Sequence, residues 1–295
     1  MTGCVVCLLA VILTFGTTPF YFRNERPGLP TVIVNILIAV AANQIIILFG
    51  ITATDDEVVC SSVALLLHYV HLVGSLWLIC YVVHIYRQLW QLSERPWTIL
   101  GYCLVSWLLP AGFVVSSYLI NPKGYETNQY CWLTIQGGMG ISFVLPMVFL
   151  LLLNTVFILA SMKRFFALRS VTPKNEIDRI RFSLRTGMVI LPYFFVNWFF
   201  SVLAFEDVFT TMFHYIFALT NSLQGILIFL FFCALNPKLQ RACRETIRRR
   251  GKIRRMSSVR MKRSSFSTRH ERESCRYNDS YPLLPDSSNE IHSIL

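Results

Sequence analysis

Long apolar runs alternate with short polar segments along most of this chain. An apolar helix of about 20 residues, rising 1.5 Å per residue, crosses the ~30 Å hydrocarbon core of a bilayer. Inside these runs the sequence lacks the alternation of apolar and polar positions that membrane β-barrels show. The pattern therefore predicts an all-α membrane protein, a seven-transmembrane helix bundle with spans at about residues 3–22, 30–52, 58–87, 96–120, 136–163, 182–205 and 208–235.

The distribution of charge orients this predicted bundle. Of the 27 lysines and arginines, only Lys123 falls in the even-numbered gaps between spans, and the others lie in or at the edge of the odd-numbered gaps or in the C-terminal tail. Because cytoplasmic loops are enriched in lysine and arginine, the N-terminus is expected outside the cell and the C-terminus inside. The formal net charge of +11 then belongs to the cytoplasmic face, which argues against a nucleic-acid-binding protein.

Three regions are expected along the chain. Residues 1–237 form the transmembrane domain. In residues 238–251, Leu239, Cys243 and Ile247 are spaced four apart among basic residues, which predicts a short amphipathic helix on the inner membrane surface. Residues 252–295 are rich in serine and arginine and poor in aromatic residues, which predicts a disordered cytoplasmic tail.

Two of the nine cysteines are expected to form a disulfide. Cys60, at the outer end of the third span, and Cys131, in the second outer loop, form the only pair away from the first span that reaches the oxidising side. The chain contains no acids, histidines or cysteines at metal-ligand spacing and no pattern of a nucleophile with its base. We therefore expect neither a cofactor nor enzymatic activity.

Polar side chains inside the spans have two interpretations. The last span contains Asn221 and Gln224, three residues apart on one helix face, beside Gly225, and the second span contains Asn43 and Gln44. Such groups serve either as hydrogen-bonding contacts between packed helices or as a ligand or switch site. The two interpretations have about equal weight.

Prolines interrupt three spans. Pro110, Pro146 and Pro192 each remove a backbone hydrogen bond, which kinks a membrane helix at that point. Such kinks open a cavity toward the outside. Pro192 lies six residues before Trp198 and is the residue at which the sixth span is expected to pivot.

The ordered set of motifs resembles the seven-helix domain of adhesion-class G-protein-coupled receptors, which are related to the secretin class. The resemblance extends over about residues 3–245. It is carried by HYVHLVGSLWLICYVVHIY at 68–86, SWLLP at 106–110, YCWL at 130–133, Pro146 with Asn154, Leu191-Pro192 followed by Trp198, and LTNSLQGILIFLFFCALN at 219–236.

The resemblance implies a plasma-membrane receptor that binds an apolar peptide or another extracellular ligand and activates a heterotrimeric G protein. The family's ligand cavity corresponds here to Trp132, Trp198, Asn221, Gln224 and Tyr69. The activation switch corresponds to Pro192, Trp198, His84, Tyr86 and Gly225, and the basic residues Arg179, Arg181 and Arg185 are expected to face the G protein.

The chain departs from the family pattern at the inner end of the bundle. The family has a histidine where Ile33 lies and a glutamate where Tyr81 lies. In the family, that histidine and that glutamate form a polar latch, and both are absent from this chain. The double replacement avoids leaving one buried ionisable partner alone. Phe195 also replaces a glycine near the pivot. We expect a shifted balance between inactive and active states.

The tail carries short motifs for further partners. Ser257, Ser264 and Ser265 resemble kinase sites, and phosphates there would weaken contact with anionic membrane lipid and recruit arrestin. Tyr281 with Leu283 and Leu284 resembles a signal for endocytic adaptors. Ser293 and Leu295 resemble an end that binds PDZ proteins.

The start at Met1 suggests an N-terminally truncated or short form without a tethered agonist. Such a chain signals by itself, binds a free ligand, or acts as a non-signalling partner or decoy of full-length receptors. A seven-helix transporter is disfavoured, because the spans contain almost no ionisable residues of the kind that line ion paths.

Overall fold

The computed structural model describes residues 1–19, 28–90, 96–125, 130–133, 139–170, 173–206, 211–236, 239–241, 244–249 and 251. The chain divides into two compact units, Met1–Gln240 and Arg241–Leu295. In the second unit residues 244–249 are helical, inside the predicted amphipathic helix. Cys243 and the whole predicted tail, residues 252–295, lie outside the described part.

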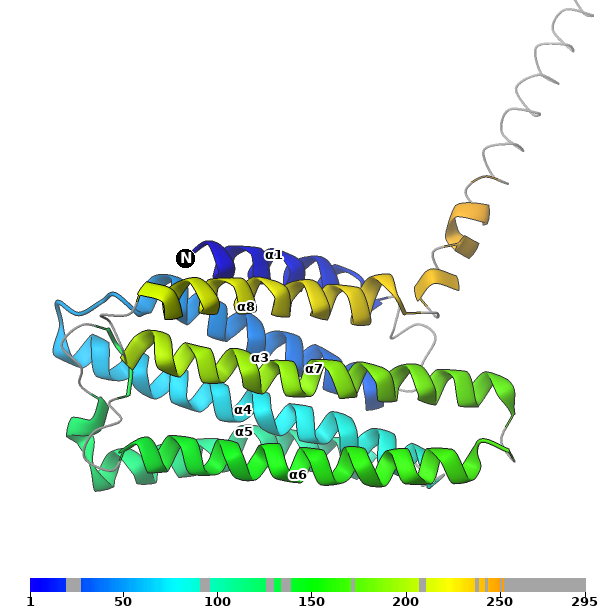
Figure 1. The fold of residues 1–295 in the computed structure, drawn as a ribbon, viewed down its shortest axis with the longest axis horizontal. Helices are drawn as coiled ribbons and strands as arrows, with labels where there is room; N and C mark the ends of the chain where they lie inside the picture. The colour runs from blue at the N-terminus through cyan, green and yellow to red at the C-terminus, as the bar shows by residue number, and fades with distance from the viewer. Residues whose placement is uncertain are drawn as a thin grey trace, which may run out of the picture. The chain divides into compact units, whose positions relative to one another are not determined.

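The first unit consists of helices that lie side by side with their axes roughly aligned (Figure 1). No strand occurs among the described residues, and η1 and η3 are single short turns of 3₁₀ and π type. In chain order the elements are α1 (Thr2–Gly16), α3 (Gly28–Gly50), α4 (Glu57–Leu89), α5 (Pro96–Ile120), η1 (Pro122–Tyr125), α6 (Met139–Leu168), α7 (Lys174–Glu206), α8 (Thr211–Phe229) and η3 (Leu230–Ala234).

Six of these helices, α3 to α8, are long and apolar enough to cross a membrane. The prediction of an all-helical bundle of membrane-length segments is confirmed for these six. The shorter apolar helix α1 has 15 residues and a length of about 22 Å. The predicted first span, 3–22, is longer than α1, and its last three residues lie outside the described part.

Large apolar side chains point outward from α5 and α6. Leu108, Leu109, Phe149 and Leu152 are all exposed at the surface of the bundle. Contact of so much apolar surface with water is unfavourable, whereas lipid tails accept it. The chain is therefore a multi-pass integral membrane protein.

The central helix is α4. At its start the Asp56 side chain accepts hydrogen bonds from the backbone N–H groups of Val58 and Val59, at 2.9 and 3.3 Å, and so caps the helix. From there α4 packs against α3, α5, α6 and α7, and Trp77 in its middle is completely buried. Contacts made by α4 therefore reach most of the bundle.

The bundle has two chemically different ends. The disulfide end contains Cys60 at the start of α4, and the basic end contains Arg179 near the start of α7. At 33 residues, α7 is about 50 Å long, longer than the hydrocarbon core is thick. The helix α7 is therefore long enough for its basic end to extend out of the hydrocarbon core.

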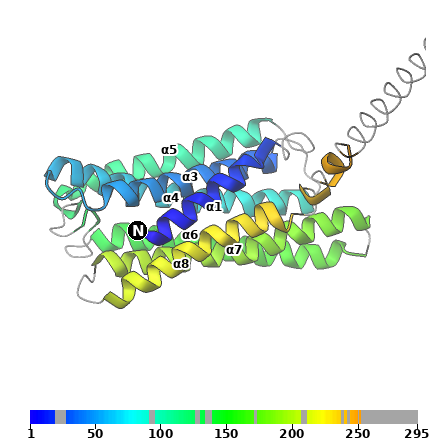
Figure 2. The same ribbon diagram turned by 90° about the horizontal axis from the view of Figure 1, so that it is seen from above.

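Helix α1 packs closely on α8. A Cβ atom on Gly3 would lie 2.3 Å from the Ala218 carbonyl oxygen, and one on Gly225 would lie 2.5 Å from the Cα atom of Cys7. Figure 2 shows α1 lying against α8 in the view from above. The absence of a side chain at Gly225 therefore permits the close approach of a neighbouring helix, which is α1.

The three predicted kink prolines, Pro110, Pro146 and Pro192, lie inside α5, α6 and α7. Each helix continues through its proline. After α8 the chain forms the π turn η3, in which the Leu235 N–H donates to the Leu230 carbonyl oxygen at 2.7 Å. This turn directs Phe232 into the bundle, where it is buried.

Candidate functional site

Five neutral polar side chains form a hydrogen-bonded polar junction between α3, α7 and α8: Gln44, Asn197, Thr220, Asn221 and Gln224. Gln44 of α3 and Asn221 of α8 exchange two hydrogen bonds: Gln44 Nε2 donates to Asn221 Oδ1 at 3.1 Å, and Asn221 Nδ2 donates to Gln44 Oε1 at 2.8 Å. Both side chains are almost completely buried. A buried amide in a membrane protein needs such partners, because the hydrocarbon offers none.

Asn197 brings α7 into this polar junction. Its Nδ2 donates to Asn221 Oδ1 at 3.3 Å and to Gln224 Oε1, and its Oδ1 accepts from the Thr220 hydroxyl at 3.0 Å. Asn221 and Gln224 were predicted from the sequence as site residues, whereas Asn197 was missed and Gln44 was not assigned to the site. The signal for Asn197 was its position beside Trp198 as a lone amide in an aromatic run.

The polar junction also reaches α1. Asn221 Nδ2 lies 3.1 Å from Cys4 Sγ, to which it donates. Through Asn221 the junction therefore joins α1, α3, α7 and α8. Separating any one of these helices breaks hydrogen bonds that no solvent replaces inside the membrane.

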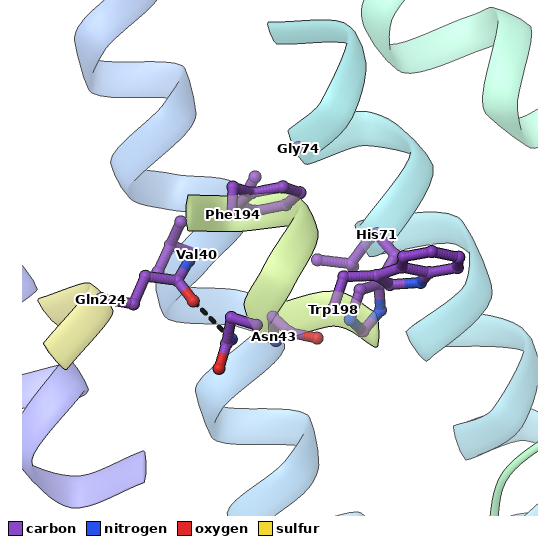
Figure 3. Close-up of a pocket in the computed structure, with 10 residues that line it drawn as sticks. Val40, Asn43, His71, Gly74, Phe194, Trp198 and Gln224 are labelled. Atoms are coloured by element: carbon purple, nitrogen blue, oxygen red, sulfur yellow. Dashed lines mark hydrogen bonds between the residues drawn. The ribbon is translucent and has the colours of Figure 1, made fainter. Parts of the chain in front are cut away.

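A small cavity lies beside the polar junction. It offers about 10 Å³ for the centre of a water-sized molecule, which is close to what a single water needs. Two predicted ligand residues, Trp198 and Gln224, line it, and Trp132, Asn221 and Tyr69 do not. Its complete lining is Ala39, Val40, Asn43, Val70, His71, Gly74, Phe194, Asn197, Trp198 and Gln224 (Figure 3).

The disulfide end is filled by an outer aromatic cluster, made of His71, Trp132, Phe143, Trp198 and Phe205. The ring centroid of Trp132 lies 5.6 Å from that of His71, 5.7 Å from that of Phe143 and 5.1 Å from that of Phe205. Phe143 also packs on Trp198, with 5.4 Å between ring centroids. Trp132, which was expected to line a ligand cavity, is only 1% exposed and is packed inside this cluster.

The loop that contains Trp132 is fixed at two points. A disulfide joins Cys60 to Cys131, with 4.7 Å between their Cα atoms, as the distribution of cysteines predicted. The Cys131 N–H also donates to the Ile51 carbonyl oxygen at 2.9 Å. These two bonds hold Trp132 in the outer aromatic cluster.

A second loop residue, Tyr125 of η1, is also buried at the disulfide end. Its hydroxyl lies 3.0 Å from His68 Nδ1. Burial raises the pKa of Tyr125 above its ordinary value, and a hydrogen bond with Ser117 opposes this shift. Tyr125 therefore remains a neutral hydroxyl that anchors the loop.

Tyr69 lies on another side of α4. Its hydroxyl donates to the Trp107 carbonyl oxygen on α5 at 3.1 Å, and the Trp107 Nε1 donates to Asn35 Oδ1 on α3 at 3.2 Å. The structure thus connects Tyr69 to α5 and separates it from the other predicted ligand residues.

The predicted switch residues on α4 are not together. His84 is buried, with its Nε2 atom 3.0 Å from Gln88 Nε2 and its ring against that of Tyr102. Tyr86 is partly buried and packs between Trp90 and Phe157 of α6. The two side chains therefore contact different neighbours.

Tyr81 makes a contact with α7. Its hydroxyl donates to the Ser183 carbonyl oxygen at 3.0 Å, and its ring packs against Phe232 of η3 and against Gly187 of α7. Ile33 and Phe195, the other departures from the family pattern, are both buried. At Tyr81, where the resemblance predicts a glutamate that pairs with position 33, the structure has a neutral hydrogen bond from α4 to α7.

The three predicted G-protein-facing arginines lie on the basic end of α7. Arg179 and Arg185 are exposed, and Arg181 is partly exposed and lies 3.5 Å from an Asp178 oxygen. The predicted phosphorylation, trafficking and PDZ-binding residues lie outside the described part: Ser257, Ser264, Ser265, Tyr281, Leu283, Leu284, Ser293 and Leu295. Groups of three metal ligands are absent from the described residues.

Comparison with known sequences identifies a receptor family. The sequence model of the family described as "7 transmembrane receptor (Secretin family)" matches residues 1–228. The chain is 27% identical over 257 residues to Latrophilin-like protein 1 of Caenorhabditis elegans. It is 29% identical over 252 residues to Adhesion G-protein coupled receptor D1 of Homo sapiens and 28% identical over 280 residues to Cadherin EGF LAG seven-pass G-type receptor 1 of Mus musculus.

These matches cover most of this chain and a small part of each relative. They include 84%, 81% and 95% of the chain, in the same order, and 25%, 28% and 9% of the relatives. The chain therefore spans well under a third of the length of these relatives.

Proposed function

This chain belongs to the secretin family of seven-transmembrane receptors, and we propose that it forms the transducing domain of an adhesion-type G-protein-coupled receptor. In this role it converts the binding of an apolar peptide or another extracellular ligand into activation of a heterotrimeric G protein. The proposal rests on the family match and on the adhesion-type relatives, of which the chain covers between 9% and 28% of the length.

The proposed receptor has its disulfide end outside and its basic end in the cytoplasm. An outside location supplies the oxidising conditions that the bond between Cys60 and Cys131 requires. Arg179, Arg181 and Arg185 at the other end follow the enrichment of basic residues on the cytoplasmic side. Helix α1, which packs on α8, is then the first of seven spans.

The proposed ligand site is the outer aromatic cluster. Aromatic walls with few polar groups suit an apolar peptide. Because Trp132 is buried there, a ligand must displace its side chain before it contacts Trp198. Asn221 and Gln224 then respond from the polar junction, to which Trp198 is linked by its neighbour Asn197. We assign Tyr69 to packing with α5.

One structural observation carries the proposed movement: α7 is bonded to different helices on the two sides of Pro192. Toward the disulfide end, Asn197 bonds to Asn221 and Gln224 of α8. Toward the basic end, the Ser183 carbonyl oxygen accepts from Tyr81 of α4. A helix bonded in this way, with a proline between the bonds, suits a two-state movement about Pro192.

The movement we propose swings the basic end of α7 away from α4 and admits the G protein. Arg179 and Arg185 are exposed and free to contact an acidic partner. Gly225 lets α8 remain close to α1 during this movement, while His84 and Tyr86 adjust on α4. Arrestin, endocytic adaptors and PDZ proteins are further proposed partners, through the tail.

The proposal is tested in cells that express the chain with sensors for the main classes of G protein. We expect a basal signal above that of cells without the chain, and a lower signal from Pro192→Ala at equal surface expression. Pro110→Ala in α5 is the matched control and leaves the signal unchanged. If every sensor stays at background although the chain reaches the cell surface, the proposal fails.

Co-expression with an adhesion receptor in the same cells tests the alternative that the chain is a non-signalling partner. A chain that gives no signal itself but lowers the signal of a co-expressed adhesion receptor acts as a decoy. Substrate-dependent current across the membrane indicates a transporter instead.

A further inference from the structure

The small cavity beside the polar junction is lined by polar atoms that have no protein partner. Asn43 Oδ1 on α3 and Trp198 Nε1 on α7 are buried, and neither makes a hydrogen bond to any described residue. Both residues line the cavity. A buried donor or acceptor without a partner is destabilising, and most so inside a membrane, so such pairs of atoms usually share an internal molecule.

His71 of α4 contributes a third polar atom. Its Nδ1 lies 2.7 Å from the Leu67 carbonyl oxygen, which can only accept. Nδ1 therefore carries the proton of the neutral ring, and Nε2 is left as an acceptor. Because His71 lines the cavity, we infer that Nε2 is a second acceptor there, beside the unpartnered Asn43 Oδ1 and the Trp198 Nε1 donor.

The size and lining of the cavity select the molecule that it can take. The space open to the centre of a water-sized molecule, about 10 Å³, is close to that required by one water. The lining contains no Asp, Glu, Lys or Arg, so a metal cation or an anion would lack an opposite charge. A water has two hydrogens to donate and lone pairs that accept, which matches two acceptors and one donor.

We propose that this cavity is a hydration site, in which one ordered water donates to Asn43 and His71 and accepts from Trp198. The water connects α3, α4 and α7 at the level of the polar junction. It lies beside Gln224 and Asn197 and also beside two members of the outer aromatic cluster (Figure 3). Movement of α7 that displaces Trp198 therefore breaks this connection. The inference stands independently of coupling to a G protein.

The test is radiolytic hydroxyl-radical labelling of the full chain in lipid nanodiscs, read by mass spectrometry. Radicals formed from a bound water label the side chains next to it even when bulk solvent does not reach them. Trp77 is the matched control, because it is completely buried, its Nε1 also lacks a partner, and it does not line the cavity. We expect Trp198 to be labelled at least threefold faster than Trp77. Equal rates would overturn the proposal.

A pair of variants connects the labelling to this cavity. Asn43→Leu removes one acceptor and fills space, and we expect the labelling of Trp198 to fall to the rate of Trp77. Asn35→Leu, which also removes an amide from α3 but lies outside the cavity lining, leaves Trp198 labelling unchanged. If Asn43→Leu does not fold, Gly74→Ala serves, since its Cβ would lie 3.2 Å from Phe194 Cζ and narrow the cavity.

The identity of the molecule is tested by exchanging sodium for choline in the buffer. A water leaves the labelling of Trp198 the same in both. A rate that depends on sodium would mean that the cavity holds a cation, which contradicts the proposal. Unchanged Trp198 labelling in both Asn43→Leu and Gly74→Ala would also contradict it.

Discussion

The Tyr81 hydroxyl on α4 donates to the Ser183 carbonyl oxygen on α7 at 3.0 Å. Tyr81 is one of the two positions at which the family resemblance predicts an ionisable latch, and its bond joins the central helix to the helix that we propose to move. The bond is uncharged, because it joins a phenol hydroxyl to a backbone carbonyl. Neutral hydrogen bonds contribute less than charged ones, so this contact is a weak restraint on α7.

Removing this hydroxyl raises basal signalling. Tyr81→Phe keeps the ring against Phe232 and loses a bond worth about 1 kcal/mol, which corresponds to a ~5-fold shift toward the active state. G-protein sensors in cells measure the change. Tyr118→Phe on α5 is the control, because the packing of its ring on Tyr125 is retained and the residue belongs neither to the predicted switch nor to the ligand site. An unchanged basal signal from Tyr81→Phe at equal surface expression would show that the bond from Tyr81 to Ser183 does not restrain α7.

Introducing the residues that the family resemblance predicts at positions 33 and 81 tests the opposite change in basal signal. The double substitution Ile33→His with Tyr81→Glu replaces the neutral bond by an ionisable pair, and we expect a lower basal signal. If the signal of the double variant equals that of the original chain, the two departures do not set the balance between states.

The polar junction stabilises the bundle. Asn197→Leu leaves Gln224 without its partner and removes one bond to Asn221, which costs about 1–3 kcal/mol of folding stability. Thermal unfolding in detergent measures this loss as a lower midpoint. In the control, Asn154→Leu, the amide that is lost bonds the Leu150 carbonyl oxygen of its own helix, so the midpoint changes less. Equal midpoints for the two variants would show that the junction contributes little.

Contact between α1 and α8 requires a glycine at position 225. In Gly225→Ala the new Cβ would lie 2.5 Å from the Cα atom of Cys7, and backbone there cannot give way without moving α1. We expect a loss of about 1–3 kcal/mol, measured by thermal unfolding. Gly112→Ala is the matched control, since nothing lies within 4 Å of its added Cβ. Full stability of Gly225→Ala would mean that α1 is not held at this distance.

The disulfide holds Trp132 in the outer aromatic cluster. The bond closes a loop with a sequence separation of 71 residues, for which chain entropy predicts a contribution of about 4 kcal/mol. Cys131→Ser is therefore expected to lower the unfolding midpoint and to expose Trp132, seen as a red shift in its fluorescence. Cys103→Ser removes a cysteine outside the disulfide and serves as the control. A buried Trp132 in Cys131→Ser would show that aromatic packing alone holds the loop.

The helices could be predicted from the sequence, because bilayer thickness dictates runs of about 20 apolar residues. The disulfide followed from the location of two cysteines on the oxidising side. The polar junction could not be predicted in full, because Asn197 bonds to residues 24 and 27 positions away, and Gln44 and Asn221 are 177 positions apart. Nothing local to Asn197 specifies those partners.

The neighbouring helix that a residue of α4 faces could also not be predicted from the sequence. Tyr69 and His71 are two residues apart on α4, yet Tyr69 bonds to α5 and His71 lines the cavity near α7. Only the rotation of α4 within the bundle separates them. The π turn η3 has no proline or glycine that would predict it, although it determines the direction of Phe232.

The most direct test of the account is GDP–GTP exchange on purified heterotrimeric G proteins mixed with the purified chain in nanodiscs. If the chain is a receptor whose α7 moves to admit a G protein, exchange is faster for at least one G-protein class. It increases further with Tyr81→Phe, and the effect is lost when Arg179 and Arg185 are both changed to Glu. Exchange at the rate of empty nanodiscs for every class, with a chain that is folded, would contradict it.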